Sequence, residues 1–174
     1  MQTPRLRRAT TAAGIGSVLL LTLMLGLALA GQQKPSPSSL KGVWRHVEIT
    51  TTGPNGRTVK NPQPGLLILT DRYFSVTREP GEAPRRELPP PDKATDKDIA
   101  EAARGFVGQA GTYDVTGGEL TYRYVVSLVP NQMRQGSFTT FTFKRDGDTL
   151  YLTQKATQTG PLANPTTFRY MRLE

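Results

Sequence analysis

The strongest constraint on the fold is an alternation of apolar and polar residues with a period of two. Its clearest example is one segment with an apolar or aromatic residue at every second position: Leu120, Tyr122, Tyr124, Val126 and Leu128. Such alternation is typical of antiparallel strands with one buried face. It predicts eight strands: Gly42–Thr51, Gly65–Thr70, Tyr73–Arg78, Gly108–Val115, Glu119–Val129, Ser137–Arg145, Thr149–Lys155 and Thr166–Leu173.

The connections between these segments are mostly short. Asp71-Arg72, Thr116-Gly117-Gly118 and Asp146-Gly147-Asp148 are typical of hairpin turns. Eight antiparallel strands joined in this way tend to close, because closure removes unpaired edges. We therefore expect a mainly β chain that folds as an eight-stranded antiparallel barrel.

One helix is predicted within this pattern. Thr95 is its expected N-cap, and Asp96 and Asp98 in the first turn favour the positive end of the helix dipole. A stripe of apolar residues is expected to pack on the barrel end: Ile99, Ala102, Ala103 and Phe106. The segment 79–93, with five prolines, cannot form a central strand and is expected to be a long, mobile loop near the barrel mouth.

The N-terminal segment resembles an export signal. A basic start with Arg5, Arg7 and Arg8 precedes an apolar run from Val18 to Ala30, which ends in an A-x-A site. This pattern predicts a signal peptide at 1–30, a flexible tether at 31–39 and a folded domain at 40–174. Export to the periplasm or the medium follows. An uncleaved membrane anchor is the alternative, because the apolar stretch is long enough to span a bilayer.

Composition excludes several kinds of site. The chain has no cysteine and one histidine, His46, which excludes disulfides, thiolate metal sites, a cysteine nucleophile and zinc sites built on several histidines. The net charge is +8, but the basic residues form no run with interleaved aromatics, so no nucleic-acid partner is expected. No phosphate-binding glycine loop is present, and neither a cofactor nor a metal is expected.

Two parts of the sequence resemble a known family. Gly42-Val43-Trp44 resembles the G-x-W signature on the first strand of lipocalins. The stretch 94–115 is similar to the bacterial and fungal lipocalin-like domain family, with Arg104-Gly105-Phe106 and Gly111-Thr112-Tyr113 at the matching places. The resemblance covers about 40–152 and implies a lipocalin-like barrel. It implies no catalytic residues.

The resemblance also implies how one barrel end closes. In lipocalins the tryptophan of the G-x-W signature packs under an arginine from near the end of the chain. Trp44 and Arg172 are the expected pair here, with Arg169 as the second choice. Because residues 44, 46 and 48 of a regular strand point the same way, His46 and Glu48 are expected to face inward with Trp44.

The inward residues define the candidate ligand site. We expect ligand contacts from the aromatic side chains Tyr122, Tyr124, Phe141 and Phe143 together with Trp44, His46 and Glu48. The first interpretation is an exported protein that binds a small, mainly apolar molecule. The second is a small barrel isomerase, cyclase or hydrolase that uses His46, Glu48 or a tyrosine, with His46 and Glu48 as a possible acid–base pair. The third is a structural envelope protein whose barrel is filled by its own side chains.

Overall fold

The computed structural model describes residues 40–174. The predicted signal peptide at 1–30 and the tether at 31–39 lie outside the described residues. Within 40–174, no helix has the length and apolar character needed to cross a membrane.

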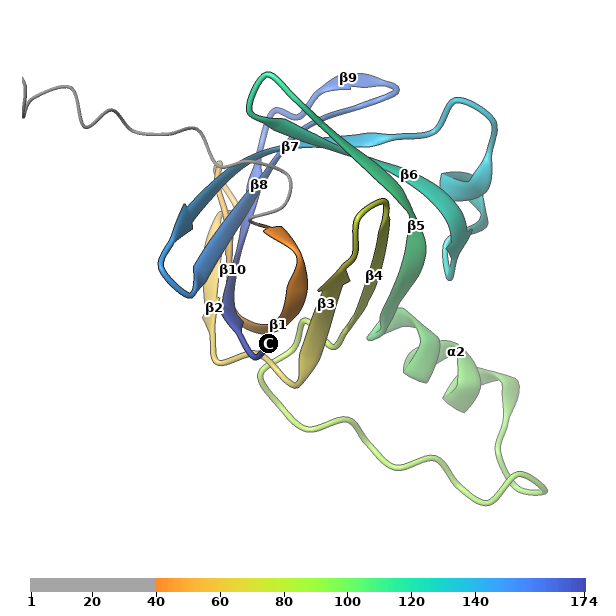
Figure 1. Cartoon of the computed structure of the whole chain (residues 1–174). Helices are drawn as coiled ribbons and strands as arrows, with labels where there is room; N and C mark the ends of the chain where they lie inside the picture. Colours follow the sequence, from red (N-terminus) through yellow and green to blue (C-terminus); the bar gives the residue numbers. More distant parts are fainter. Residues whose placement is uncertain (1–39) are drawn as a thin grey trace, which may run out of the picture. The chain divides into compact units, whose positions relative to one another are not determined.

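Eight antiparallel strands close into a barrel, which confirms the predicted fold class (Figure 1). The strands follow one another around the barrel in chain order, and the pairing of β8 with β10 closes the ring. The barrel strands are β1 (Gly42–Thr51), β3 (Gly65–Leu69), β4 (Tyr73–Arg78), β5 (Val107–Thr116), β6 (Glu119–Ser127), β7 (Thr139–Asp146), β8 (Thr149–Thr157) and β10 (Thr166–Arg172).

Short elements complete the fold. The strand β2 (Arg57–Lys60) pairs with β1, and β9 (Gly160–Pro161) pairs with β8. A 3-10 helix, η2 (Pro130–Met133), follows β6, and the helix α2 (Asp96–Arg104) precedes β5. Neither short strand nor η2 was expected from the sequence, because two to four residues are too few to show a period.

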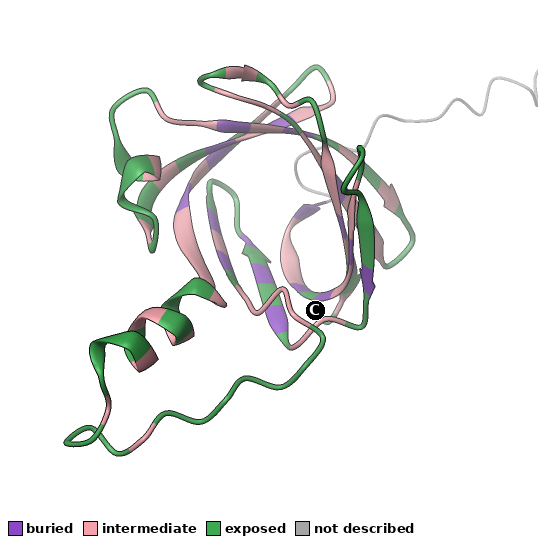
Figure 2. Cartoon of the chain, turned by 180° about the vertical axis from the view of Figure 1, so that it is seen from behind, coloured by how far each residue is buried: buried purple, intermediate pink, exposed green. Residues whose placement is uncertain are grey.

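The inward residues of the strands form one continuous core, and Figure 2 shows buried positions scattered along the strands around the ring. Apolar side chains alternate with exposed ones because successive residues of a strand point to opposite faces. The fully buried side chains are large ones from both halves of the sequence: Trp44, Tyr122, Tyr170, Phe74, Leu40, Leu67, Leu120, Leu150, Leu152 and Val76.

Three β-bulges interrupt the alternation. The pairing register shifts beside Val47 in β1, Val125 in β6 and Lys155 in β8, so each of these residues is extra to its ladder. The expectation that Val126 continues the inward face of β6 is therefore wrong: Val126 is exposed on the outside. Leu128 lies beyond the end of the strand and is nearly half exposed.

The helix α2 begins as predicted. Thr95 accepts a hydrogen bond from the backbone N–H of Asp98, and the Asp98 carboxylate accepts one from the Thr95 backbone, which completes a capping box. These hydrogen bonds from Thr95, together with the contact of Arg86, lower the pKa of Asp98 to about 2. The predicted packing of the apolar stripe is wrong, because α2 buries no residue and Ile99 is 54% exposed (Figure 2).

Candidate functional site

One end of the barrel is sealed around Trp44. This side chain has no exposed surface, and its indole Nε1–H donates to the Leu40 carbonyl oxygen at 2.9 Å. The guanidinium carbons of Arg172 and Arg145 lie 5.2 Å and 5.7 Å from the centre of a Trp44 ring. Of the two arginines considered from the sequence, Arg172 is the one that contacts Trp44, whereas Arg169 pairs with Glu48.

The opposite end holds a pocket of about 150 Å³. It lies where β4 and β6 end and β5 begins, and residues of the segment after β6 form part of its rim. We call it the mouth pocket. Its walls combine apolar and polar side chains, and Arg78 is the single charged residue among them. The lining residues are Arg78, Phe106, Val107, Gly108, Gln109, Tyr124, Ser127, Leu128, Val129, Gln132 and Gln154.

Arg78 occupies the last inward position of β4, after the buried residues Phe74 and Val76. Its guanidinium carbon lies 4.1 Å from the centre of the Phe168 ring on β10, which is nearly fully buried. The positive charge of Arg78 also acts on the buried hydroxyl of Tyr170, where it opposes part of the rise in pKa that burial causes. The guanidinium of Arg78 thus reaches Phe168 on β10, a strand that β3 and β1 separate from β4.

A glycine gives Arg78 its space. Gly65 on β3 pairs directly with Arg78, and a Cβ added to Gly65 would lie 2.6 Å from the Arg78 Cβ. That separation is far below van der Waals contact, so any larger residue at this position would have to displace Arg78. The inward face of β3 is therefore open at the point where the arginine leaves the wall.

Tyrosines surround this cation. Tyr122 stacks on Phe74 with ring centres 3.8 Å apart, and its buried hydroxyl has no hydrogen-bond partner. The Tyr124 hydroxyl donates to Thr139 Oγ1 at 2.7 Å. Burial raises the pKa of Tyr122 well above its ordinary value and raises that of Tyr124 and Tyr170, so these hydroxyls stay protonated and can donate.

His46 and Glu48 do not form the acid–base pair that the sequence suggested. His46 faces inward and stacks on Tyr170, with ring centres 5.1 Å apart. The bulge at Val47 then reverses the alternation, so Glu48 lies on the other face and pairs with Arg169 at 3.3 Å. The catalytic interpretation therefore loses the pairing of His46 with Glu48.

The environment of His46 keeps it neutral at neutral pH. Burial, and then the positive charge of Arg78, lower its pKa to about 4, and the Glu48 backbone offsets only part of this shift. Neither ring nitrogen makes a hydrogen bond of good geometry. His46 is thus a neutral polar group beside the buried cation.

Of the residues expected to contact a ligand, only Tyr124 lines the mouth pocket. Trp44 lies at the sealed end, Phe141 is buried against Tyr122, and Phe143 packs against the core. The sequence analysis missed Arg78, Gln109 and Gln154. The signal for Arg78 was present, because it continues the alternation of Phe74 and Val76, but a charged residue there was not considered as an inward one.

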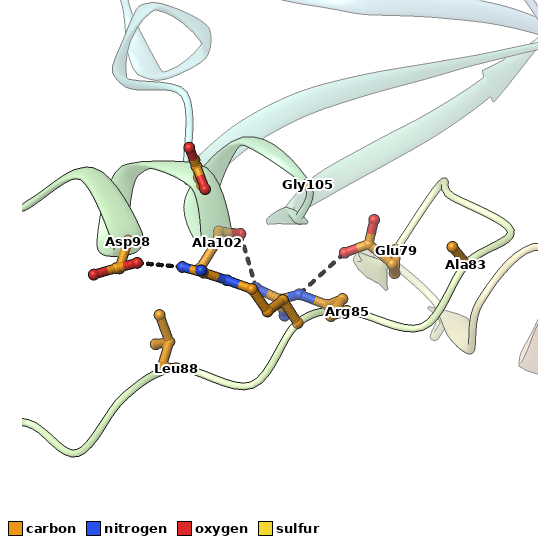
Figure 3. A pocket seen from close by; sticks show the side chains of 9 residues that line it. Glu79, Ala83, Arg85, Leu88, Asp98, Ala102 and Gly105 are labelled. Atoms are coloured by element: carbon orange, nitrogen blue, oxygen red, sulfur yellow. Dashed lines mark hydrogen bonds and ion pairs between the residues drawn. The ribbon is translucent and has the colours of Figure 1, made fainter. Parts of the chain in front are cut away.

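A loop and helix stand beside the mouth pocket and form a second hollow of about 270 Å³, shown in Figure 3. Arg85 links the loop to the helix: its guanidinium donates to the Ala102 carbonyl oxygen at 2.8 Å and pairs with Glu79 at 3.2 Å. Arg86 pairs with Asp98 in the helix. The guanidinium of Arg85 also lies 5.4 Å from the ring of Phe106, which lines the mouth pocket.

An apolar groove of about 330 Å³ lies on the outer face of the barrel, on the side of β3 to β6. Tyr73, Val125 and Val126 are exposed along it. It is separated from the mouth pocket by the wall of β5, where Gln109 faces inward and Ala110 faces outward. The two sites can therefore be altered independently.

Comparisons with known proteins agree with this architecture. No curated protein sequence matches the chain. Residues 41–168 match the family described as the lipocalin-like domain. This match covers most of the described barrel. The chain therefore belongs to the lipocalin-like domain family, and its fold is that of a small-ligand-binding barrel protein.

Proposed function

We propose that the protein is exported and binds one small, mainly apolar molecule in the open half of its barrel. The observation that carries this proposal is the mouth pocket, where apolar side chains and inward polar groups share one concave site. Small-molecule sites are concave and pair apolar surface, which supplies affinity, with polar groups that fix the orientation of the ligand. The sealed end around Trp44 leaves the mouth as the route of entry.

Two neighbouring positions on β5 allow the site to be tested. Gln109 lines the mouth pocket, whereas Ala110 lines the outer groove. Gln109→Trp fills the pocket with a bulky side chain, and Ala110→Trp fills the groove and serves as the matched control. Both variants place the same residue on the same strand, so they differ in which face is blocked.

The measurement is native mass spectrometry of protein purified from its own host. We expect the unmodified protein and Ala110→Trp to carry one bound small molecule, and Gln109→Trp to have lost it. Absence of any bound molecule from the unmodified protein would favour the filled structural barrel. Loss of the bound molecule from Ala110→Trp alone would move the site to the outer groove.

A further inference from the structure

We propose that the molecule bound in the mouth pocket is a monocarboxylic acid with an apolar body, and that Arg78 binds its carboxylate inside the barrel. This inference rests on the proposed function, because it assigns the chemistry of the same pocket. It starts from a charge that no acidic residue within 40–174 balances.

Arg78 has no acidic partner in the part of the chain that the structure describes. None of the ion pairs within 40–174 includes it. Its contacts are the Phe168 ring and the Tyr170 hydroxyl, and its Nε–H is buried without a hydrogen-bond acceptor. A cation withdrawn from water in this way is unfavourable unless an anion or a set of acceptors compensates it.

Polar groups close to Arg78 also lack hydrogen-bond partners. The buried Tyr122 hydroxyl has no partner, and its pKa, raised by burial, keeps it a donor. His46 is neutral and its ring nitrogens are unpartnered, so one of them is also an N–H donor. The interior therefore gathers one cation with a hydroxyl and an imidazole that can donate, and a carboxylate there would pair with the cation and accept from these donors.

The pocket fits a single negative charge on an apolar body. Arg78 is its only charged lining residue, so a dianion such as a phosphate ester would remain half compensated. A guanidinium matches the planar geometry of a carboxylate and can bind it through two parallel hydrogen bonds. Beyond the cation, the walls are apolar at Phe106, Val107, Leu128 and Val129.

Matched probes test the charge directly. 2-Naphthoate and 2-naphthamide share one apolar body and differ in whether the polar end is an anion or a neutral amide. We expect isothermal titration calorimetry to show that the unmodified protein binds the acid about 10- to 100-fold more tightly than the amide, the range of a hydrogen-bonded charge pair.

Substitutions of Arg78 and of a control arginine test which positive charge binds the carboxylate. Arg78→Gln should remove the preference for the acid and leave the affinity for the amide within about twofold. Arg123→Gln is the control, because Arg123 is an exposed arginine on the outer face, paired with Asp114, and its removal should change neither affinity. Arg78→Met supplies an apolar variant of similar length, and thermal melting checks that each protein is folded.

The outcomes separate the two proposals. Equal affinity of the unmodified protein for acid and amide overturns the carboxylate inference and leaves the proposed function standing. A preference for the acid that persists in both Arg78 variants also overturns it. If neither probe binds, the inference fails, and if the protein from its host carries no small molecule, the proposed function fails with it.

Discussion

Trp44 is the residue on which the sealed end of the barrel depends. It is fully buried, donates to the Leu40 carbonyl and lies under Arg172. We expect Trp44→Ala to lower the free energy of unfolding by about 3–5 kcal/mol, the range for removal of a large buried aromatic side chain. Urea unfolding followed by circular dichroism measures this change.

The contact with Arg172 is tested by a double-mutant cycle. Arg172→Ala should destabilise less than Trp44→Ala, and the double variant should lose less than the sum, because both changes remove one shared contact. Arg123→Ala, far from this end on the outer face, is the control that should add to Trp44→Ala without coupling. Strict additivity of Trp44→Ala and Arg172→Ala would contradict the pairing.

His46 makes the stability of the barrel depend on pH. Its pKa falls from 6.5 to about 4 on folding, because of burial and the nearby Arg78. Between these values the unfolded chain binds a proton that the folded chain does not, so stability is full above pH 6.5 and decreases as the pH falls. We expect a loss of about 2 kcal/mol between pH 7 and pH 5.

Urea unfolding at several pH values checks this prediction. His46 is the only histidine of the chain, so its replacement isolates the effect. In His46→Gln the free energy of unfolding should vary much less over the same pH range, whatever its absolute value. An equally steep dependence in the variant would show that other groups cause it.

At the scale of single residues, the sequence predicted the sealed end better than the open one. A tryptophan in a family signature and a basic residue near the chain end are local features that can be recognised. Arg78 is different, because its role depends on Gly65 and Phe168, which only the folded barrel brings beside it. It also depends on the lack of an acidic partner for Arg78 within 40–174. Glu48 was placed on the wrong face, since one extra residue at Val47 reverses every side chain after it.

Among the elements, the helix α2 is expected to unfold independently of the barrel. It is nine residues long and buries none of them, so it adds little to global stability. Thr95→Ala removes the N-cap and should destabilise the helix by about 1 kcal/mol. Limited proteolysis should then cleave the segment 79–106 faster, while the midpoint of global urea unfolding stays unchanged.

Asp96→Asn is the control for that variant. It removes an acidic side chain from the same turn but keeps the hydrogen bonds between Thr95 and Asp98. Its rate of cleavage should change much less than that of Thr95→Ala. A fall in global stability on loss of the cap would instead mean that the helix folds as one unit with the barrel.

The eight barrel strands were predicted because each is long enough for its alternation to be visible and each is followed by turn residues. The helix was also predicted, from its cap and its acidic first turn. Its exposed stripe was not, because periodicity shows that a face is apolar but not whether a neighbour covers it. Ile99 stays exposed because the chain directs α2 away from the barrel wall (Figure 1).

For the whole molecule, we expect cleavage between Ala30 and Gly31, after the A-x-A site. N-terminal sequencing of protein recovered outside the cytoplasm should begin at Gly31. Ala28→Arg and Ala30→Arg, which introduce large charged residues at the site, should leave the precursor uncleaved. Protein in the membrane fraction that still begins at Met1 would instead show that the N-terminal segment is an anchor.

The strand that completes the ring, β10, is the last one in the chain, and it pairs with the first, β1, through contacts such as Trp44 with Arg172. Closure of this barrel therefore requires β10, which follows all the other barrel strands in the sequence. Pairing over so long a separation is also slow. The order of strands thus delays closure until all eight barrel strands are available, which would suit the export proposed above.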